Sequence, residues 1–422
     1  MIWPNNNGAG RIRENHFRFC SETLVKKPEK PRILFLNQMA GPLFRGLAQD
    51  ISAKWPPGIL LTGHPDALKG KQMDSLIIKT APKYQRKNYL SRALSGILYI
   101  FYALFYCWRL PRGTLVFSMS EPLFLGIVGY LLKRLRQQHY VILIYDIYPD
   151  TLIRFGVLRE SGLITRFWRR MNRLVWENSD IVFTIGEAMA ATLEGMFDAG
   201  KTLPGKVIFI PNWADTDWIR PVAKDKNEFA KKYGQVEKLT VMYSGNLGKT
   251  HDIETIIAVA KQLKGYDSIH FMIIGEGAKK ALVEQAKQRD GLDNLTILPF
   301  QPEEVLHESL PTADIAIITL DKGAENLSAP SKTCYSMAAG SALIGLCDDN
   351  SEVGRIIKRH NCGIVVSPGD ADAMVAGIEE LLNDRAKLNL YKSNGRRAAE
   401  NFYSRKNTCS YIDTLFGAGL MR

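Results

Sequence analysis

The chain has 422 residues, of which 46% are hydrophobic, and it carries a formal net charge of +12 at pH 7. This length exceeds one typical hydrophobic core and the apolar content excludes intrinsic disorder, so two folded domains are expected. The six cysteines form no C-x-x-C pair, which favours a reduced compartment over secretion and predicts no metal site.

The positive charge lies in the first half of the chain. Residues 1–210 contain 29 Lys and Arg against 15 Asp and Glu, whereas residues 211–422 contain 26 against 28. This asymmetry predicts a polyanionic partner for the first half, either nucleic acid or an anionic membrane surface. No zinc-finger spacing, RNP-type aromatic motif or GXXG clamp accompanies the charge, so no nucleic-acid partner is expected.

Strand-like and helical segments alternate along the chain, which implies parallel sheets built from βαβ units. The predicted strands of the first half are 33–36, 115–118, 141–145, 181–185 and 207–210. Those of the second half are 239–243, 270–274, 295–298, 315–319, 342–346 and 364–366.

The Pro, Asn and Asp residues of Ile210–Pro221 are typical of a linker between the two sets of strands. We therefore predict an α/β fold with two facing doubly wound Rossmann-like domains, at 31–211 and 212–399. An N-terminal extension (1–30) precedes them. A C-terminal helix (400–422) follows them and could pack back on the first domain.

One predicted helix of the first half is apolar with basic ends. The run Ala93–Trp108 contains no charged residue and is flanked by arginines. It is shorter than the about 20 residues that span a bilayer, but it suits a helix lying in the membrane interface. The predicted membrane-contacting residues are Arg92, Tyr99, Phe101, Phe105, Trp108 and Arg109. A second segment, Ile164–Trp176, repeats the pattern. In the alternative interpretation, both are core helices with solvated basic faces.

Three segments of the second half are predicted at the carboxyl ends of strands, where open α/β sheets bind ligands. The first, "SGNLGKT" at 244–250, ends like a P-loop, but Tyr243 stands where that motif requires glycine, so a P-loop nucleotidase is not indicated. A glycine turn before a helix still presents backbone N–H groups to an anion. The second segment is Gly275-Glu276-Gly277. The third, Ala329–Gly340, places a lysine at the start of a helix. Together they predict a diphosphate site.

In combination, "SGNLGK", "IIGEG", "ADIAIITL" and the helix ending in "MAAG", preceded by "IPNWAD", resemble the GT-B glycosyltransferases of family 4. The resemblance covers about residues 31–410. "YDIYPD" and "SGNLGKTHD" look most like the bacterial branch that builds exopolysaccharide and O-antigen repeats, including fucosyl and N-acetylfucosaminyl transferases.

This resemblance implies a UDP- or GDP-sugar donor bound mainly by the second domain, and transfer without a metal or cofactor. It also implies a polyprenyl-diphosphate-linked glycan acceptor at the cytoplasmic face of the membrane, handled by the first domain. Retention of stereochemistry is expected from the family alone.

The resemblance also assigns residues to the donor. The donor diphosphate would be held by Gly41, Gly245, Asn246, Lys249, Ser331, Lys332 and Thr333. The base, ribose and sugar would be met by Gly275, Gly277, Phe300, Gln301, Glu325 and Tyr335. The chain departs from the family pattern in two places: many members have arginine at position 246, and the glutamates of E-x7-E are replaced by Leu327 and Tyr335.

Glycosyl transfer also requires a group that receives the acceptor proton. Asp146, at the end of the strand "VILIYD", is the first candidate, with Asp150 and Glu121 as further catalytic candidates. In the alternative interpretation, Asp146 holds its loop and Asp150 caps the next helix. The rival functions are a nucleotide-sugar epimerase or phosphorylase of the same shape, and an inactive membrane scaffold.

Overall fold

The computed structural model describes residues 32–64, 75–85, 89–154, 156–197, 205–248, 251–319 and 331–421. The predicted extension (1–30), Lys249, Glu325 and Leu327 lie outside these ranges.

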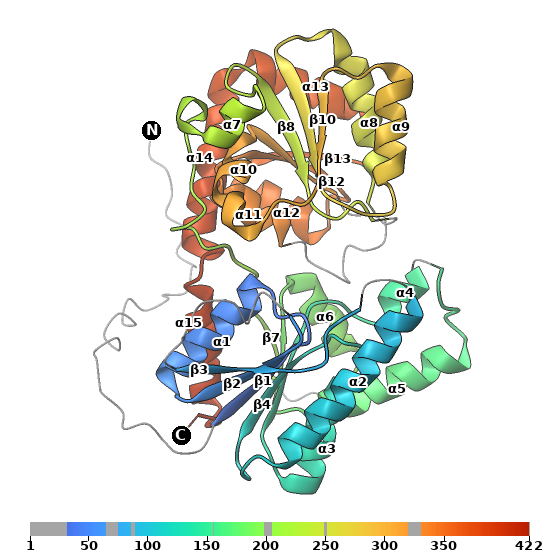
Figure 1. Cartoon of the computed structure of the whole chain (residues 1–422), viewed down its shortest axis with the longest axis vertical. Helices are drawn as coiled ribbons and strands as arrows, with labels where there is room; N and C mark the ends of the chain where they lie inside the picture. Colours follow the sequence, from blue (N-terminus) through green and yellow to red (C-terminus); the bar gives the residue numbers. More distant parts are fainter. Residues whose placement is uncertain are drawn as a thin grey trace, which may run out of the picture.

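The first domain contains one parallel sheet of seven strands in the order β3-β2-β1-β4-β5-β6-β7 (Figure 1). Its strands are β1 (Ile33–Leu36), β2 (Gly58–Thr62), β3 (Leu76–Thr80), β4 (Leu115–Met119), β5 (Tyr140–Ile144), β6 (Ile181–Thr184) and β7 (Val207–Phe209). Its helices are α1 (Pro42–Lys54), α2 (Tyr89–Trp108), α3 (Gly126–Arg136), α4 (Asp150–Arg154), α5 (Leu163–Asn178) and α6 (Glu187–Gly195).

The second domain contains a parallel sheet of six strands in the order β10-β9-β8-β11-β12-β13. Its strands are β8 (Leu239–Ser244), β9 (Ile269–Ile274), β10 (Leu295–Leu298), β11 (Ile315–Thr319), β12 (Ala342–Leu346) and β13 (Gly363–Val366). Its α-helices are α7 (Glu228–Lys232), α8 (Ile253–Gln262), α9 (Lys280–Asp290), α10 (Leu306–Ser309), α11 (Lys332–Ala338), α12 (Glu352–His360), α13 (Ala371–Asn383) and α14 (Arg385–Phe402). Short 3-10 turns are η2 (Lys224–Lys226), η3 (Leu263–Gly265), η4 (Glu303–Val305) and η5 (Leu310–Thr312).

The predicted fold class is confirmed, because both sheets are parallel and doubly wound with the same order of their first six strands. Most strands are buried along their whole length, as expected for parallel sheets covered on both faces. Two strands of the first sheet, β2 and β3, are absent from the predictions. β2 begins at a glycine directly after Pro56-Pro57, a pattern typical of a turn, and β3 is half exposed and contains Lys79.

Two crossings of the chain connect the domains. In the predicted linker, Trp213 is buried in the core of the first domain and Ile219 in a core cluster of the second. The backbone N–H of Ala214 donates to the carbonyl of Tyr403 (2.9 Å), so this segment runs beside the returning C-terminal chain. The last helix, α15 (Asn407–Gly417), then packs beside α1 of the first domain and buries Tyr411 there (Figure 1).

Helix α2 buries one stripe and exposes the rest. Tyr99, Ala103 and Cys107, spaced by four residues, are fully buried in the first domain. The prediction that Tyr99 contacts a membrane is therefore wrong: its hydroxyl donates to the carbonyl of Leu61 (2.7 Å) inside the domain. Because this stripe anchors the helix along the domain, α2 lies on the protein surface, although its length and composition would also suit a membrane span.

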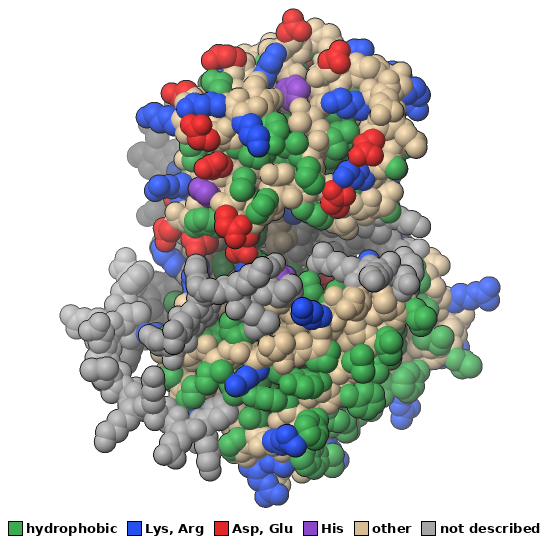
Figure 2. All heavy atoms as spheres, in the orientation of Figure 1, with side chains coloured by type: hydrophobic (Ala, Val, Ile, Leu, Met, Phe, Trp, Pro, Cys, Tyr) green, Lys and Arg blue, Asp and Glu red, His purple; other side chains and the backbone are tan. Residues whose placement is uncertain are grey.

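The exposed apolar side chains of α2 and α5, two helices that both pack against α3, form what we call the apolar face. Figure 2 shows hydrophobic side chains gathered over α2, with Lys and Arg side chains around them. Phe101 and Phe105 are 67% and 57% exposed, and the Arg109 guanidinium lies 4.0 Å from the centroid of the Phe105 ring. The exposed members of the face are Leu90, Leu94, Ile97, Leu98, Phe101, Tyr102, Phe105 and Trp108 on α2, and Leu163, Ile164 and Phe167 on α5.

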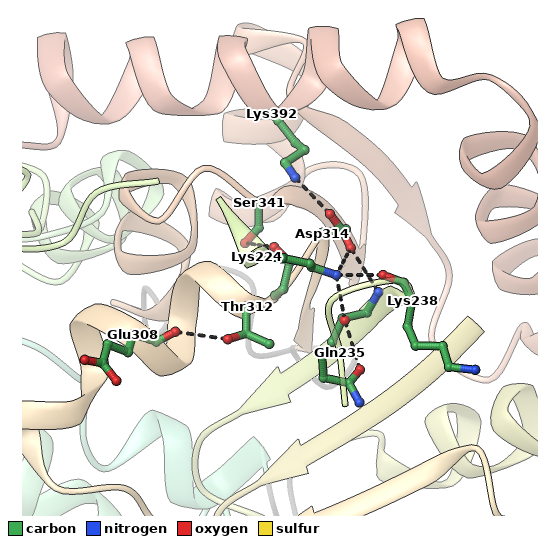
Figure 3. A network of polar contacts seen from close by, with 10 residues as sticks. Lys224, Gln235, Lys238, Glu308, Thr312, Asp314, Ser341 and Lys392 are labelled. Carbon is green, nitrogen blue, oxygen red and sulfur yellow. Dashed lines mark hydrogen bonds and ion pairs between the residues drawn. The ribbon is translucent and has the colours of Figure 1, made fainter. Parts of the chain in front are cut away.

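A buried ionic network lies at the amino ends of the strands of the second sheet (Figure 3). Asp314 precedes β11 and bonds to Lys224 of η2 and to Lys392 of α14, the latter at 2.9 Å. It also accepts the backbone N–H of Thr240 in β8 (3.0 Å). Burial works to raise the pKa of Asp314, but the two ammonium groups outweigh it and hold that pKa below its usual value. The network therefore joins three distant segments of the chain at the amino ends of the strands.

Candidate active site

The carboxyl ends of the two sheets face one another across an interdomain cleft. Arg45, in the first turn of α1, pairs with Glu303 beyond the end of β10 (2.8 Å). A second ion pair, between Glu187 at the start of α6 and Arg359 of α12 (3.0 Å), also crosses the cleft. Loops that follow the strands of both domains are thereby brought to one place, which is where ligands bind in open α/β sheets.

On the second domain, the loop after β8 lies directly on the loop after β9. The N–H of Gly245 donates to the carbonyl of Ile274 and that of Leu247 to the carbonyl of Glu276, both at 2.8 Å. A Cβ on Gly275 would lie 1.9 Å from the carbonyl oxygen of Gly245, and one on Gly277 would lie 2.4 Å from that of Leu247. Loop packing thus requires both glycines of the predicted Gly275-Glu276-Gly277 segment, and their contact with a nucleotide stays a prediction.

Lys332 lies beside the first of these loops. Its Nζ donates to the hydroxyl of Tyr243 (2.9 Å), which in turn donates to the carbonyl of Asn246 (2.6 Å). A Cβ on Gly245 would approach the Cε of Lys332 to 2.5 Å, so glycine is needed for the lysine to reach this place. Burial lowers the pKa of Lys332 to about 8, and no carboxylate in the described ranges pairs with it. We call Gly245, Asn246, Tyr243 and Lys332 the cationic seat.

His251 lies beside the cationic seat and was not predicted as a site residue. Burial, together with the nearby charges of Lys332 and Lys279, lowers its pKa to about 4, so the ring is neutral at pH 7. Its Nδ1 is buried and has no hydrogen-bond partner within the described parts of the chain. The only signal in the sequence is its position, three residues beyond Gly248 in "GKTH".

The remaining predicted donor residues lie around the cleft in different settings. Gly41 is the N-cap of α1, and a Cβ there would have nothing within 4 Å. Phe300, just beyond β10, is 49% exposed. Tyr335 is partly buried near Arg45 and Glu303, whose charges act on its hydroxyl.

Three further residues were predicted to contact the donor, namely Ser331, Gln301 and Thr333. Ser331 is the N-cap residue of α11, and the Gln301 side chain donates to the carbonyl of Pro299 (2.9 Å). Thr333 is only 1% exposed, and its side chain lines a separate pocket at the hinge with Asn212. Its contact with a diphosphate stays a prediction.

On the first domain, two carboxylates stand at the ends of neighbouring strands. Burial, together with the nearby charge of Glu121, raises the pKa of Asp146, two residues beyond β5, to about 7. Desolvation by surrounding protein atoms also raises the pKa of Glu121, which follows β4 and is still exposed to solvent. A carboxylate with a pKa near 7 can receive a proton at neutral pH, which suits a general base.

Asp150 is held in a different way. It occupies the first turn of α4 and accepts two bonds from the Arg169 guanidinium, at 2.5 and 3.2 Å. The carboxylate thus forms an ion pair within the first domain, and neither its capping of α4 nor its catalytic role is shown, so both stay predictions.

Comparison with known proteins agrees with this geometry. Residues 225–398 match the family model described as glycosyl transferases group 1. The chain is 27% identical over 301 residues to the probable glycosyltransferase WbjE of Pseudomonas aeruginosa, covering 71% of this chain and 74% of that protein. It is 26% identical over 280 residues to the putative colanic acid biosynthesis glycosyl transferase WcaI of Escherichia coli, covering 65% and 67%.

Among solved structures, WaaG, a glycosyltransferase involved in lipopolysaccharide biosynthesis, superposes with a TM-score of 0.69 at 13% identity. The superposition covers 91% of this chain and 100% of WaaG. The chain is therefore a glycosyltransferase with the GT-B fold.

Proposed function

We propose that this glycosyltransferase moves a sugar from a UDP- or GDP-linked donor to a polyprenyl-diphosphate-linked glycan, with retention, in surface polysaccharide synthesis. The reaction would take place at the cytoplasmic face of the membrane. The names of two similar proteins, which refer to colanic acid and lipopolysaccharide, support this class of pathway.

The cationic seat is the observation that supports a nucleoside-diphosphate-sugar donor. A buried ammonium group without a carboxylate partner in the described ranges is costly, and an anionic ligand would offset that cost. The seat lies at the carboxyl end of β8, facing the cleft. There Lys332 would stabilise the charge that develops on the departing nucleoside diphosphate.

Asp146 would act on the acceptor as a general base. It faces the same cleft from the first domain, and no cation pairs with it in the described part of the chain. The acceptor hydroxyl would bond to this carboxylate, and Asp146 would take its proton as the new glycosidic bond forms.

The apolar face would seat the enzyme on the membrane. It combines long aliphatic and aromatic side chains with arginines, including Arg92 on α2 and Arg109 directly after it, and the first half of the chain has a large basic excess. Such a surface fits a bilayer interface with anionic headgroups, and its exposed apolar area is otherwise unfavourable.

Thermal unfolding with UDP, GDP, CDP and ADP in separate samples tests the donor half. A nucleotide at about 100 times its Kd adds about 2.7 kcal/mol to the free energy of unfolding, which raises Tm by a few degrees. We expect one or two nucleotides to raise Tm in wild type and in the surface control Lys261→Ala, and none to do so in Lys332→Ala. If no nucleotide raises Tm of the wild type at millimolar concentration, the proposed donor class is wrong.

A further inference from the structure

Asp252, the residue after His251, joins the loop after β8 to two other strand ends. Its backbone N–H donates to the hydroxyl of Thr319, the last residue of β11 (3.0 Å). Its Oδ2 atom accepts the backbone N–H of Gly369, three residues beyond β13 (2.8 Å). Segments at the carboxyl ends of three strands of the second sheet are therefore joined at one residue.

The same carboxylate also caps α8. Asp252 is the N-cap residue of this helix, and its Oδ1 atom accepts the backbone N–H of Thr255 (3.0 Å). The hydroxyl of Thr255 donates to Oδ2 (2.6 Å), which therefore receives two bonds. Asparagine caps a helix as well as aspartate does, but its amide has only one acceptor oxygen. Capping alone therefore does not require the second carboxylate oxygen, whereas the bond from Gly369 does.

The bonds of Asp252 connect the two segments of chain that form the cationic seat. The loop before it carries Gly245 and Asn246, and the backbone of that loop is bonded to the loop after β9 at its other end. On the opposite side, Thr319 ends β11, the strand that precedes α11 and Lys332 in the chain. The bond between Asp252 and Thr319 therefore limits how far these two segments can move apart.

His251 lies between Asp252 and the cationic seat. Its carbonyl accepts the ammonium group of Lys279 (2.6 Å), and its Nδ1 atom would lie 3.2 Å from a Cβ on Gly248. Its ring lies beside that of Tyr243 in the cationic seat, with 6.3 Å between the centroids. A displacement of Asp252 would therefore also displace the residues around the seat.

We propose that Asp252 is a positioning residue of the donor site, which holds the loop after β8 in the conformation that binds the donor diphosphate together with Lys332. The assignment rests on the proposed function and deepens it. Asp252 acts through the loop rather than through the ligand, because its carboxylate oxygens already accept bonds from Thr255 and Gly369. A loop that is fixed before binding loses less conformational entropy when the ligand binds, which increases affinity.

Two variants remove the bonds of Asp252 to the neighbouring strand ends. Asp252→Asn keeps an oxygen for the cap of α8 and presents an amide NH₂ group to the N–H of Gly369, so that bond is lost. Thr319→Val removes the hydroxyl that accepts the N–H of Asp252 and keeps the size of the side chain. The matched control is Asp370→Asn, because Asp370 caps α13 through the N–H of Ala373 (2.9 Å).

The first measurement is hydrogen–deuterium exchange of the three full-length variants without any ligand. One lost bond of this kind makes local opening easier by about tenfold, so peptides that cover 243–251 should exchange faster by that factor in Asp252→Asn and Thr319→Val. The rate along α8 should stay unchanged in Asp252→Asn, because its cap is kept. Asp370→Asn should match wild type at 243–251.

The second measurement is calorimetric titration with UDP and with GDP. The Kd of the nucleotide that binds wild type should rise about tenfold in Asp252→Asn and Thr319→Val and stay unchanged in Asp370→Asn. In steady-state kinetics the KM for the donor should rise by a similar factor with little change in kcat, since the loop holds the diphosphate before and during transfer. A merely structural residue would not produce this separation of KM from kcat.

Two results would overturn the inference. One is exchange at 243–251 that stays equal to wild type in both Asp252→Asn and Thr319→Val. The other is faster exchange at 243–251 with an unchanged Kd, which would show that the order of the loop does not matter for the donor. Failure of the proposed function gives a different result: neither nucleotide binds wild type, whereas the exchange measurement still decides whether Asp252 holds the loop.

Discussion

The loops after β1 and β8 occupy equivalent places in the two sheets but serve different purposes. After β1, Gln38 turns inward, is 2% exposed, and donates to the carbonyls of Pro82 (3.1 Å) and Ser95 (3.0 Å). This loop therefore fixes the amino-terminal half of α2. After β8, the Gly245 loop keeps its polar groups beside Lys332, where a ligand can reach them.

The two domains also differ in surface charge and in the groups that they place at the cleft. The first domain has the basic excess and the apolar face, and it places the carboxylates Asp146 and Glu121 at the cleft. The second has nearly balanced charge and places an ammonium group there. One strand order thus supports two complementary halves of a transfer reaction, since the fold fixes where loops meet but not their chemistry.

The largest effect is expected from replacing Asp146, the proposed general base in the first domain. Asp146→Asn removes the proton acceptor while keeping size and hydrogen bonding, so we expect kcat to fall on the order of 10²- to 10⁴-fold. Nucleotide binding should stay unchanged, because the cationic seat lies in the other domain. Steady-state kinetics and the nucleotide-induced change in Tm measure both. An unchanged kcat would show that Asp146 is not the general base and would leave Glu121 as the candidate.

The second effect is on the stability of the second domain. Asp314→Ala leaves Lys224 and Lys392 without their shared carboxylate, so the free energy of unfolding should fall by about 3 kcal/mol or more. Chemical denaturation measures it. The matched control Asp349→Ala breaks an exposed pair with Lys358 and should change stability by less than about 1 kcal/mol. Equal losses in the two variants would contradict a special role for the network.

The third effect tests the apolar face. Replacing Phe101, Phe105 and Phe167 with serine removes three exposed rings, so partitioning onto liposomes with anionic lipid should weaken at least about tenfold. Serine at Phe402 and Phe416, exposed aromatics on α14 and α15, is the control and should leave co-sedimentation unchanged. Equal sedimentation of both variants would show that the apolar face does not seat the protein.

The smallest effect is a pH dependence of nucleotide affinity. The pKa of Lys332 is about 8 in the empty seat, and a bound diphosphate would raise it, so binding would take up a proton when the pH exceeds 8. Affinity should be constant below about pH 7.5 and should fall by up to about tenfold per pH unit above 8. Calorimetry across this range measures it. A flat profile in wild type would show that Lys332 does not bind the diphosphate.

Most strands, and the residues Gly245, Asn246 and Lys332 of the cationic seat, could be predicted from the sequence for physical reasons, whereas β2, β3 and Tyr243 could not. Continuous apolar runs such as that of β11 indicate buried parallel strands, and glycines before a helix indicate an anion site. Tyr99 shows the limit, because it and Phe101 share one uncharged run and only packing against Leu61 separates buried from exposed residues. His251 shows another, since its neutral state results from burial and from lysines brought close by folding.

Hydrogen–deuterium exchange of the full chain, with nucleotide and with anionic liposomes in separate samples, tests the division of labour between the domains most directly. The account predicts that a nucleotide slows exchange at 243–251 and 331–335 in the second domain. It predicts that liposomes slow exchange along α2 and α5 in the first. Protection of α2 by nucleotide alone, or protection by liposomes confined to the second domain, would contradict it.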